Sequence, residues 1–181
     1  LLFAYFVLKL KSDLILTGIA LNLMASGGTV FLLTVLCGDK GVSTSMNSLV
    51  VPSVELPLIR HIPILGDILS GHNLLTYVAL LCVVLVYLLI NKSPLGLQIR
   101  SVGENPDAAE SVGISVIKTR FIALVFTGIL SGLGGAYMSM GYVSWFARDM
   151  AAGRGYMALS AQNLGNGTPI GTFLASFIFG I

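Results

Sequence analysis

Charge is scarce in this sequence. Asp, Glu, Lys and Arg make up 10% of its 181 residues, whereas about 25% is usual in a soluble globular domain. Hydrophobic residues make up 55% and the mean hydropathy is +0.91. A water-soluble fold of this size cannot bury that much apolar surface, so lipid is the expected surrounding. The net charge is only +2 and no basic run of five or more residues exists, so no nucleic-acid partner is expected.

Residues for catalysis and metal binding are also scarce. Cys37 and Cys82 lie in apolar stretches without metal-ligand spacing, which is typical of small buried hydrophobic residues. His61 and His72 have no cysteine or carboxylate at ligand spacing, so no metal site is expected. No paired carboxylates or nucleophile constellation occurs, and no G-x-x-x-x-G-K-[ST] run could cradle ATP phosphates. The chain is therefore not expected to be an enzyme.

Long apolar runs are what the sequence has in quantity. A membrane helix needs about 20 mostly apolar residues, and four segments approach this: 14–37, 74–90, 121–142, and 156–181 with an interruption at 165–169. Residues 1–8 resemble the tail of an earlier helix or an interfacial segment. The prediction is an all-α, polytopic transmembrane helical bundle with about four to five membrane segments, one of them broken. Because the chain begins and ends inside apolar runs, we expect residues 1–181 to be a fragment of a single transmembrane domain.

Three connections separate these segments. Residues 38–73 contain Pro52, Pro57 and Pro63, which predicts a long ordered loop with short helical turns; residues 91–120 are the most charged stretch; and residues 143–155 carry aromatic side chains suited to a membrane interface. One set of connections carries six basic residues and the other carries four. The six are Lys9, Lys11, Lys92, Arg100, Lys118 and Arg120; the four are Lys40, Arg60, Arg148 and Arg154. This bias predicts that 91–120 is cytoplasmic and that 38–73 is external.

A short helix is predicted inside the 91–120 connection. Asn105 can cap it, Pro106 suits its first position, and Asp107 suits the positive end of the helix dipole. Gly113 can end it in a left-handed conformation. A helix of about two turns is too short to be stable alone, so it needs something to pack against. It is either an ordinary connection or a docking element for a cytoplasmic partner.

Polar residues inside the apolar segments are candidates for a solute pathway. Gly18, Asn22 and Ser26 recur at i, i+4 and i+8, so they share one helix face. Asn22 is costly against lipid, so it either borders a water-filled path or forms hydrogen bonds between helices. Gln162 and Asn163, with the nearby Asn166, either line the pathway at the break in the last segment or end a helix at the surface.

Small residues on the third segment predict close helix packing. Gly128 and Gly132, and Ser131 and Gly135, are each four residues apart, the spacing of small-residue contacts between membrane helices. No Lys, Arg, Asp or Glu lies in the middle of a membrane segment. A proton-coupled transporter usually needs such a buried ionisable relay, so the pattern favours an uncharged substrate.

Several runs resemble a known family. Asp107-Ala-Ala-x-x-x-Gly113 resembles the EAA-type loop of bacterial ABC importer permeases, with Asp in place of Glu. The longer run Gly96-Leu-x-Ile-Arg-Ser-Val-Gly-Glu-Asn-Pro-Asp-Ala-Ala resembles the permease group for simple sugars, nucleosides and branched-chain amino acids. Residues 18–27 and 150–159 resemble two further parts of the nucleoside and sugar members. The likeness extends over nearly the whole chain and is greatest to permeases that work with basic-membrane-lipoprotein-type receptors.

The resemblance implies an ABC importer permease subunit that carries a nucleoside or simple sugar across the bacterial inner membrane. It implies a cytoplasmic ATPase that holds ATP and Mg, a second permease subunit and an extracytoplasmic substrate-binding lipoprotein. The residues implied in ATPase coupling are Glu104, Asn105, Pro106, Asp107, Ala108, Ala109, Glu110 and Gly113. An ATP-independent transporter or channel for a small uncharged solute is the alternative.

Overall fold

The computed structural model describes residues 1–38, 41–43, 51–53 and 71–180, and the regular elements among them are helical. In chain order they are α1 (Leu2–Ala4), the π-helical η1 (Tyr5–Lys9), α2 (Leu14–Cys37), α4 (Leu74–Lys92), α5 (Pro94–Glu104), α6 (Pro106–Ser111), α7 (Val116–Ala136), the π-helical η2 (Tyr137–Tyr142), α8 (Arg154–Leu164) and α9 (Pro169–Ile178). Extended pairing within these ranges is limited to two isolated bridges. The all-α prediction is confirmed.

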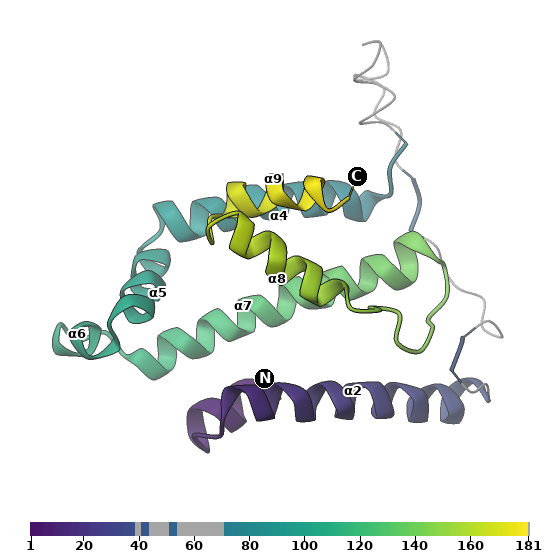
Figure 1. The fold of residues 1–181 in the computed structure, drawn as a ribbon, viewed down its shortest axis with the longest axis horizontal. Coiled ribbons are helices and arrows are strands. Elements are labelled where there is room, and N and C mark those ends of the chain that lie inside the picture. Colours follow the sequence, from purple (N-terminus) through teal and green to yellow (C-terminus); the bar gives the residue numbers. More distant parts are fainter. Residues whose placement is uncertain (39–40, 44–50, 54–70, 181) are drawn as a thin grey trace, which may run out of the picture.

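Three helices are long and apolar enough to cross a membrane. They are α2, α4 and the continuous helix Val116–Gly141, which is formed by α7 and most of η2. Their directions alternate along the chain, so that α4 runs against both α2 and α7 (Figure 1). None of the three apolar windows has a buried residue within the described part of the chain. Their apolar side chains are therefore available to lipid or to other helices.

The ends of these helices follow from local chemistry. The Asp13 carboxylate accepts hydrogen bonds from the Ile15 and Leu16 amides at 2.8 and 3.0 Å and caps α2. Gly38, at φ +74°, ends the same helix. The third span begins at Val116 rather than at 121, because the long stems of Lys118 and similar residues are tolerated at a membrane boundary.

The predicted break in the fourth segment is confirmed between α8 and α9. Asn166 adopts φ +53°, the Gly167 amide donates to the Gln162 carbonyl at 3.0 Å, and the Asn166 amide donates to the Asn163 carbonyl at 3.1 Å. This is the Schellman ending of a helix, with Asn in the left-handed position. Thr168 then caps α9 by accepting a hydrogen bond from the Gly171 amide.

The two halves of the broken segment fold back on each other. A Cβ at Gly165 would overlap the backbone of Gly171 and Thr172, so the turn can close only because residue 165 has no side chain. α9 then lies along α4 (Figure 1). The fourth segment is therefore a tight helical hairpin, and its second arm packs on the second membrane span.

Most of the predicted loop 38–73 lies outside the described residues, and its described parts form contacts with a later segment and with each other. Ser43 pairs with Phe146 through its amide and its hydroxyl, each at 2.9 Å. Asn73 caps α4 and donates from its side chain to the Val51 carbonyl at 3.1 Å. Ser43 is thus held to the residues that follow η2, and Val51 is held to Asn73 at the start of α4.

Helix α5 lies inside the 91–120 stretch, for which the sequence predicts a charged connection with a single short helix. Ser93 caps it, and Pro94 occupies its first position. Gly96 and Val102 are its buried residues, while Leu97 is 70% exposed. Its apolar residues are few, so hydropathy along the chain does not distinguish it from a loop, although its capping signal is plain.

Candidate functional site

A groove of about 820 Å³ lies between α4, α7, α8 and α9. Residues from Leu75 to Ile90 line it along nearly the whole of α4, and Leu130 and Leu133 line it from α7. α9 contributes one wall because it packs along α4. This volume falls within the range of about 300–1,000 Å³ that is usual for small-molecule sites.

A few polar groups interrupt the apolar wall of the groove. They are Thr76 on α4, Tyr137 on η2, Gln162 on α8, and Thr172 and Ser176 on α9. None of the described residues that line the groove carries a charge. The Gln162 side-chain amide has no hydrogen bond to another described residue, so both its donor and its acceptor are available.

Of the four residues predicted to line a solute pathway, only one lies in the groove. Gln162 lines the groove, whereas the neighbouring Asn163 does not. The backbone carbonyl of Asn163 accepts one of the hydrogen bonds that end α8. Asn22 and Ser26 are exposed on α2, which packs on α1 and η1, and neither residue lines the groove. Gln162 thus ends a helix through its backbone and lines the groove through its side chain, while its place on a solute pathway stays a prediction.

Thr172 and Ser176 are groove residues that the sequence analysis missed. With Thr168 they form a series at i, i+4 and i+8 on an otherwise apolar helix, the same signal that singled out Asn22. The series places hydroxyl groups on one face of α9. The sequence cannot show that this face meets α4.

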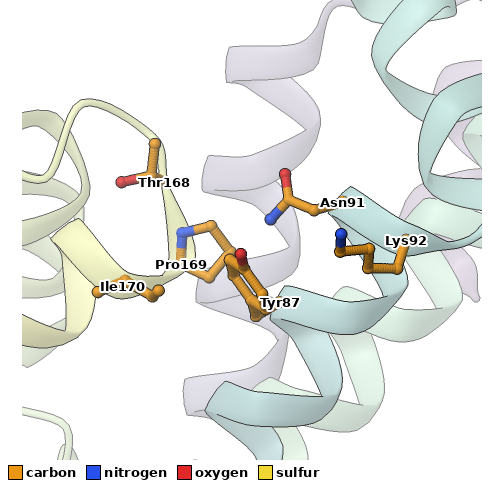
Figure 2. Close-up of a pocket in the computed structure, with 6 residues that line it drawn as sticks. All are labelled: Tyr87, Asn91, Lys92, Thr168, Pro169 and Ile170. Carbon is orange, nitrogen blue, oxygen red and sulfur yellow. The ribbon is translucent and has the colours of Figure 1, made fainter.

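A second, smaller hollow lies where α4 ends and α9 begins. It measures about 360 Å³ and contains Tyr87, Asn91 and Lys92 from α4, with Thr168, Pro169 and Ile170 from the start of α9. Figure 2 shows Pro169 beside the Tyr87 ring, with Lys92 at the far side of the hollow. Pro169 lines both hollows, so the groove reaches the end of α4 that precedes α5.

The short helix predicted at 105–113 is present as α6. The Asn105 side chain accepts from the Ala108 amide at 3.1 Å, and Pro106 occupies the first position. Gly113 has φ +85°, the Gly113 amide donates to the Glu110 carbonyl at 2.9 Å, and the Ile114 amide donates to the Ala109 carbonyl at 3.0 Å. The predicted cap and left-handed ending are both confirmed.

One face of α6 is packed and the other is open. Ala109 is 3% exposed, and the helix contacts α5 and α7. Asp107 and Glu110 are exposed, and Val112 is 74% exposed just beyond the last turn. α6 projects beyond the end of the spans together with α5 (Figure 1), and its open face carries carboxylates and an apolar side chain.

The small residues of α7 have no close neighbour among the described residues. A Cβ at Gly128, Gly132 or Gly135 would meet nothing within 4 Å. Their predicted role in close packing stays a prediction. The close backbone contacts that the structure does contain are at Gly96 and at the α8–α9 turn.

Known proteins resemble this chain along its whole length. Residues 1–181 match the family described as branched-chain amino acid transport system / permease component. The nucleoside ABC transporter permease protein NupC of Lactococcus lactis is 34% identical over 181 residues, which cover 99% of this chain and 56% of that protein. The guanosine ABC transporter permease protein NupQ of Bacillus subtilis is 32% identical, with 96% and 54% covered.

A third relative comes from an archaeon. The proposed glucose ABC transporter permease protein TsgC13 of Haloferax volcanii is 29% identical, with 98% of this chain and 53% of that protein covered. The chain thus spans about half the length of the curated relatives it matches. No solved structure matches it. Together with its apolar spans, the family match over all 181 residues shows that the chain belongs to the permease components of the branched-chain amino acid transport system family.

Proposed function

We propose that this chain is part of the membrane-spanning permease subunit of an ABC importer, and that it carries a nucleoside or simple sugar across the bacterial inner membrane. The observation that carries the proposal is the 34% identity to a nucleoside permease over 99% of the chain. The similarity to NupQ supports a nucleoside, and the similarity to TsgC13 keeps a simple sugar in view.

The groove supports an uncharged, hydroxyl-rich substrate. Its described lining offers an amide and hydroxyl groups but no charged side chain. An amide both donates and accepts hydrogen bonds, as hydroxyl groups do, so Gln162, Thr172 and Ser176 could exchange hydrogen bonds with a sugar ring. A charged substrate would lose its hydration here without gaining a counter-charge, which is costly.

ATP and Mg belong in this proposal to a separate ATPase subunit, which docks on the open face of α6. The chain has no phosphate-cradling run. The exposed side chains of Asp107, Glu110 and Val112 give α6 a surface that fits a protein partner. On this basis the 91–120 connection is cytoplasmic.

The remaining partners follow from the same proposal. A second permease subunit would complete the pathway, and an extracytoplasmic lipoprotein would deliver the substrate to the opposite side of the membrane, where the 38–73 connection lies. Lipid would cover the apolar faces of the spans that α9 and the other described helices leave open, since the apolar windows of the spans hold no buried residue among the described residues. Gly128, Gly132 and Gly135 on α7 have free space around them among the described residues, so a neighbouring helix could pack closely against them.

The test is transport by the reconstituted complex. The full permease, its partner permease, the ATPase and the receptor are placed in lipid vesicles, and uptake of radiolabelled nucleosides and simple sugars is measured with ATP and with a non-hydrolysable analogue. We expect uptake only with hydrolysable ATP. Equal uptake by the permease alone, without ATPase or ATP, would replace the proposal with an ATP-independent transporter.

A further inference from the structure

Gly96 lies at the contact between α4 and α5, where there is no room for a side chain. A Cβ at this position would overlap the carbonyl oxygens of Leu89 and Ile90 and would lie 2.6 Å from the Ile90 carbonyl carbon. These are backbone atoms of the last turns of α4, so they cannot rotate away as the end of a side chain can. The observed contact therefore requires glycine at residue 96.

The hydroxyl of Ser93 links the two helices at the same point. It donates to the Leu89 carbonyl at 2.6 Å and accepts from the Gly96 amide at 3.1 Å. It thus connects the end of α4 to the first turn of α5, while Pro94 restricts the backbone between them. We call Ser93, Pro94 and Gly96 the α4–α5 joint.

The joint lies between two parts of the molecule that have different proposed roles. On one side, α4 lines the groove from Leu75 to Ile90. On the other side, α5 leads directly into α6 through Asn105. The backbone amide of Asn105 donates to the Ser101 carbonyl, and its side chain caps α6. Val102 is buried on α5, and Ala109 is buried on α6. α6 is therefore attached to α5 by packing as well as by the chain.

We propose that the α4–α5 joint makes α4 and α5 move as one body, so that a displacement of α6 by the ATPase turns the α4 wall of the groove. Gly96 is then a positioning residue for transport, and Ser93 is its partner. The inference rests on the proposed function. Through the joint, the nucleotide state of the ATPase changes the relative free energies of two positions of α4, and the groove changes with them.

The central experiment compares Gly96→Ala with Gly103→Ala in the full complex in vesicles. Both glycines lie on α5, but a Cβ at Gly103 meets nothing within 4 Å. We expect Gly96→Ala to lower the substrate taken up per ATP hydrolysed by about tenfold, the size of effect that residues of a coupling network can have. Assembly and basal ATP hydrolysis should persist. Gly103→Ala should stay within about twofold of the wild type in this ratio.

Ser93 provides a second route if Gly96→Ala does not assemble. Ser93→Ala removes the hydroxyl link without adding volume, and Ser93→Thr retains a hydroxyl. We expect Ser93→Ala to lower the ratio of uptake to hydrolysis and Ser93→Thr to restore it. A purely structural role would instead lower the amount of complex and leave that ratio unchanged. The proposal is overturned if both Gly96→Ala and Ser93→Ala keep the wild-type ratio of uptake to hydrolysis. If Gly96→Ala does not assemble, a wild-type ratio in Ser93→Ala is enough to overturn it.

A readout that needs no known substrate separates this inference from the proposed function. Cys82 lines the groove on α4, and Cys37→Ser leaves it as the single thiol of residues 1–181, so its modification is followed by mass spectrometry of the peptide that carries Cys82. We expect ATP to change the rate at which N-ethylmaleimide modifies Cys82 in the assembled complex, and this change should be lost in Gly96→Ala. If the change is lost although no nucleoside or sugar is transported, the joint stands and the substrate proposal fails. If Gly96→Ala keeps the full change, the joint is wrong.

Discussion

At the scale of single residues, Gln162 has two separate roles. Its carbonyl accepts the hydrogen bond that ends α8, and its side-chain amide lines the groove without a described partner. A substitution that keeps the backbone bond therefore changes only the groove. This separation allows the proposed pathway to be tested without disturbing the helical hairpin.

We expect Gln162→Ala to weaken substrate binding by about two- to tenfold, since a lost hydrogen bond is worth roughly 0.5–1.5 kcal/mol. The loss should differ among nucleosides and sugars, because each offers a different partner to the amide. Uptake kinetics across a panel of substrates measure it. The control is Ser160→Ala on the same helix, where the hydroxyl bonds to the Tyr156 carbonyl and lies outside the groove. Equal effects of the two variants would remove Gln162 from the pathway.

The Asn22 side chain is predicted to act differently. Because Asn22 lies outside the groove and is costly against lipid, we expect it to hydrogen-bond to another helix in the full permease. Asn22→Ala should lower the melting temperature of the complex, in line with about 0.6 kcal/mol for such bonds in membranes. The ranking of substrates should not change. An altered ranking at an unchanged melting temperature would return Asn22 to the pathway.

At the scale of elements, α6 is the part that local sequence describes best. Its cap, its first-position proline and its left-handed ending all depend on residues within nine positions of one another. α5 was not predicted because its apolar residues are few, although Ser93 and Pro94 mark its start; in the structure it packs against α4 and α7. Two variants test the proposed docking role of α6.

Gly113→Val should uncouple the ATPase from the permease. The left-handed backbone at Gly113 costs a β-branched residue about 1–3 kcal/mol, and the end of α6 should distort. Substrate-stimulated ATP hydrolysis in the assembled complex should fall. Gly113→Asn is the control, because Asn tolerates this conformation. Normal stimulation in the valine variant would contradict the docking role.

Asp107→Lys changes the charge of α6 at its positive end. A carboxylate there is favourable by about 0.3–1 kcal/mol, and an ammonium is unfavourable by a similar amount. We expect weaker docking, measured as a higher ATPase concentration needed for half-maximal complex formation, while Asp107→Glu stays close to the wild type. Identical binding curves for the lysine and glutamate variants would show that this charge has no role.

At the scale of the whole molecule, the alternating directions of α2, α4 and α7 place α5 and α6 at the end of the bundle where α2 begins. That end holds Lys9 and Lys92 at helix termini. The topology predicted from the basic residues puts this end of the bundle in the cytoplasm. One exposed site at each end of the bundle is enough to test it.

A cysteine at Ser111, with Cys37 and Cys82 removed, should resist a membrane-impermeant thiol reagent in intact cells. A cysteine at Asp149, in the connection before α8, should react readily. Both positions are exposed in the structure, so the difference reports the side of the membrane and not burial. Labelling of the Ser111 site from outside, with protection of the Asp149 site, would invert the topology.

The sequence by itself determined the membrane spans, the break in the last segment and the form of α6. These features depend on the length of apolar runs and on caps such as Asn105, which act within a few residues. The tertiary structure alone decided that Gln162 faces a groove, that Asn22 does not, and that Gly96 touches the backbone of α4. Helical periodicity indicates which residues share a face, but the partner of that face depends on how distant helices pack.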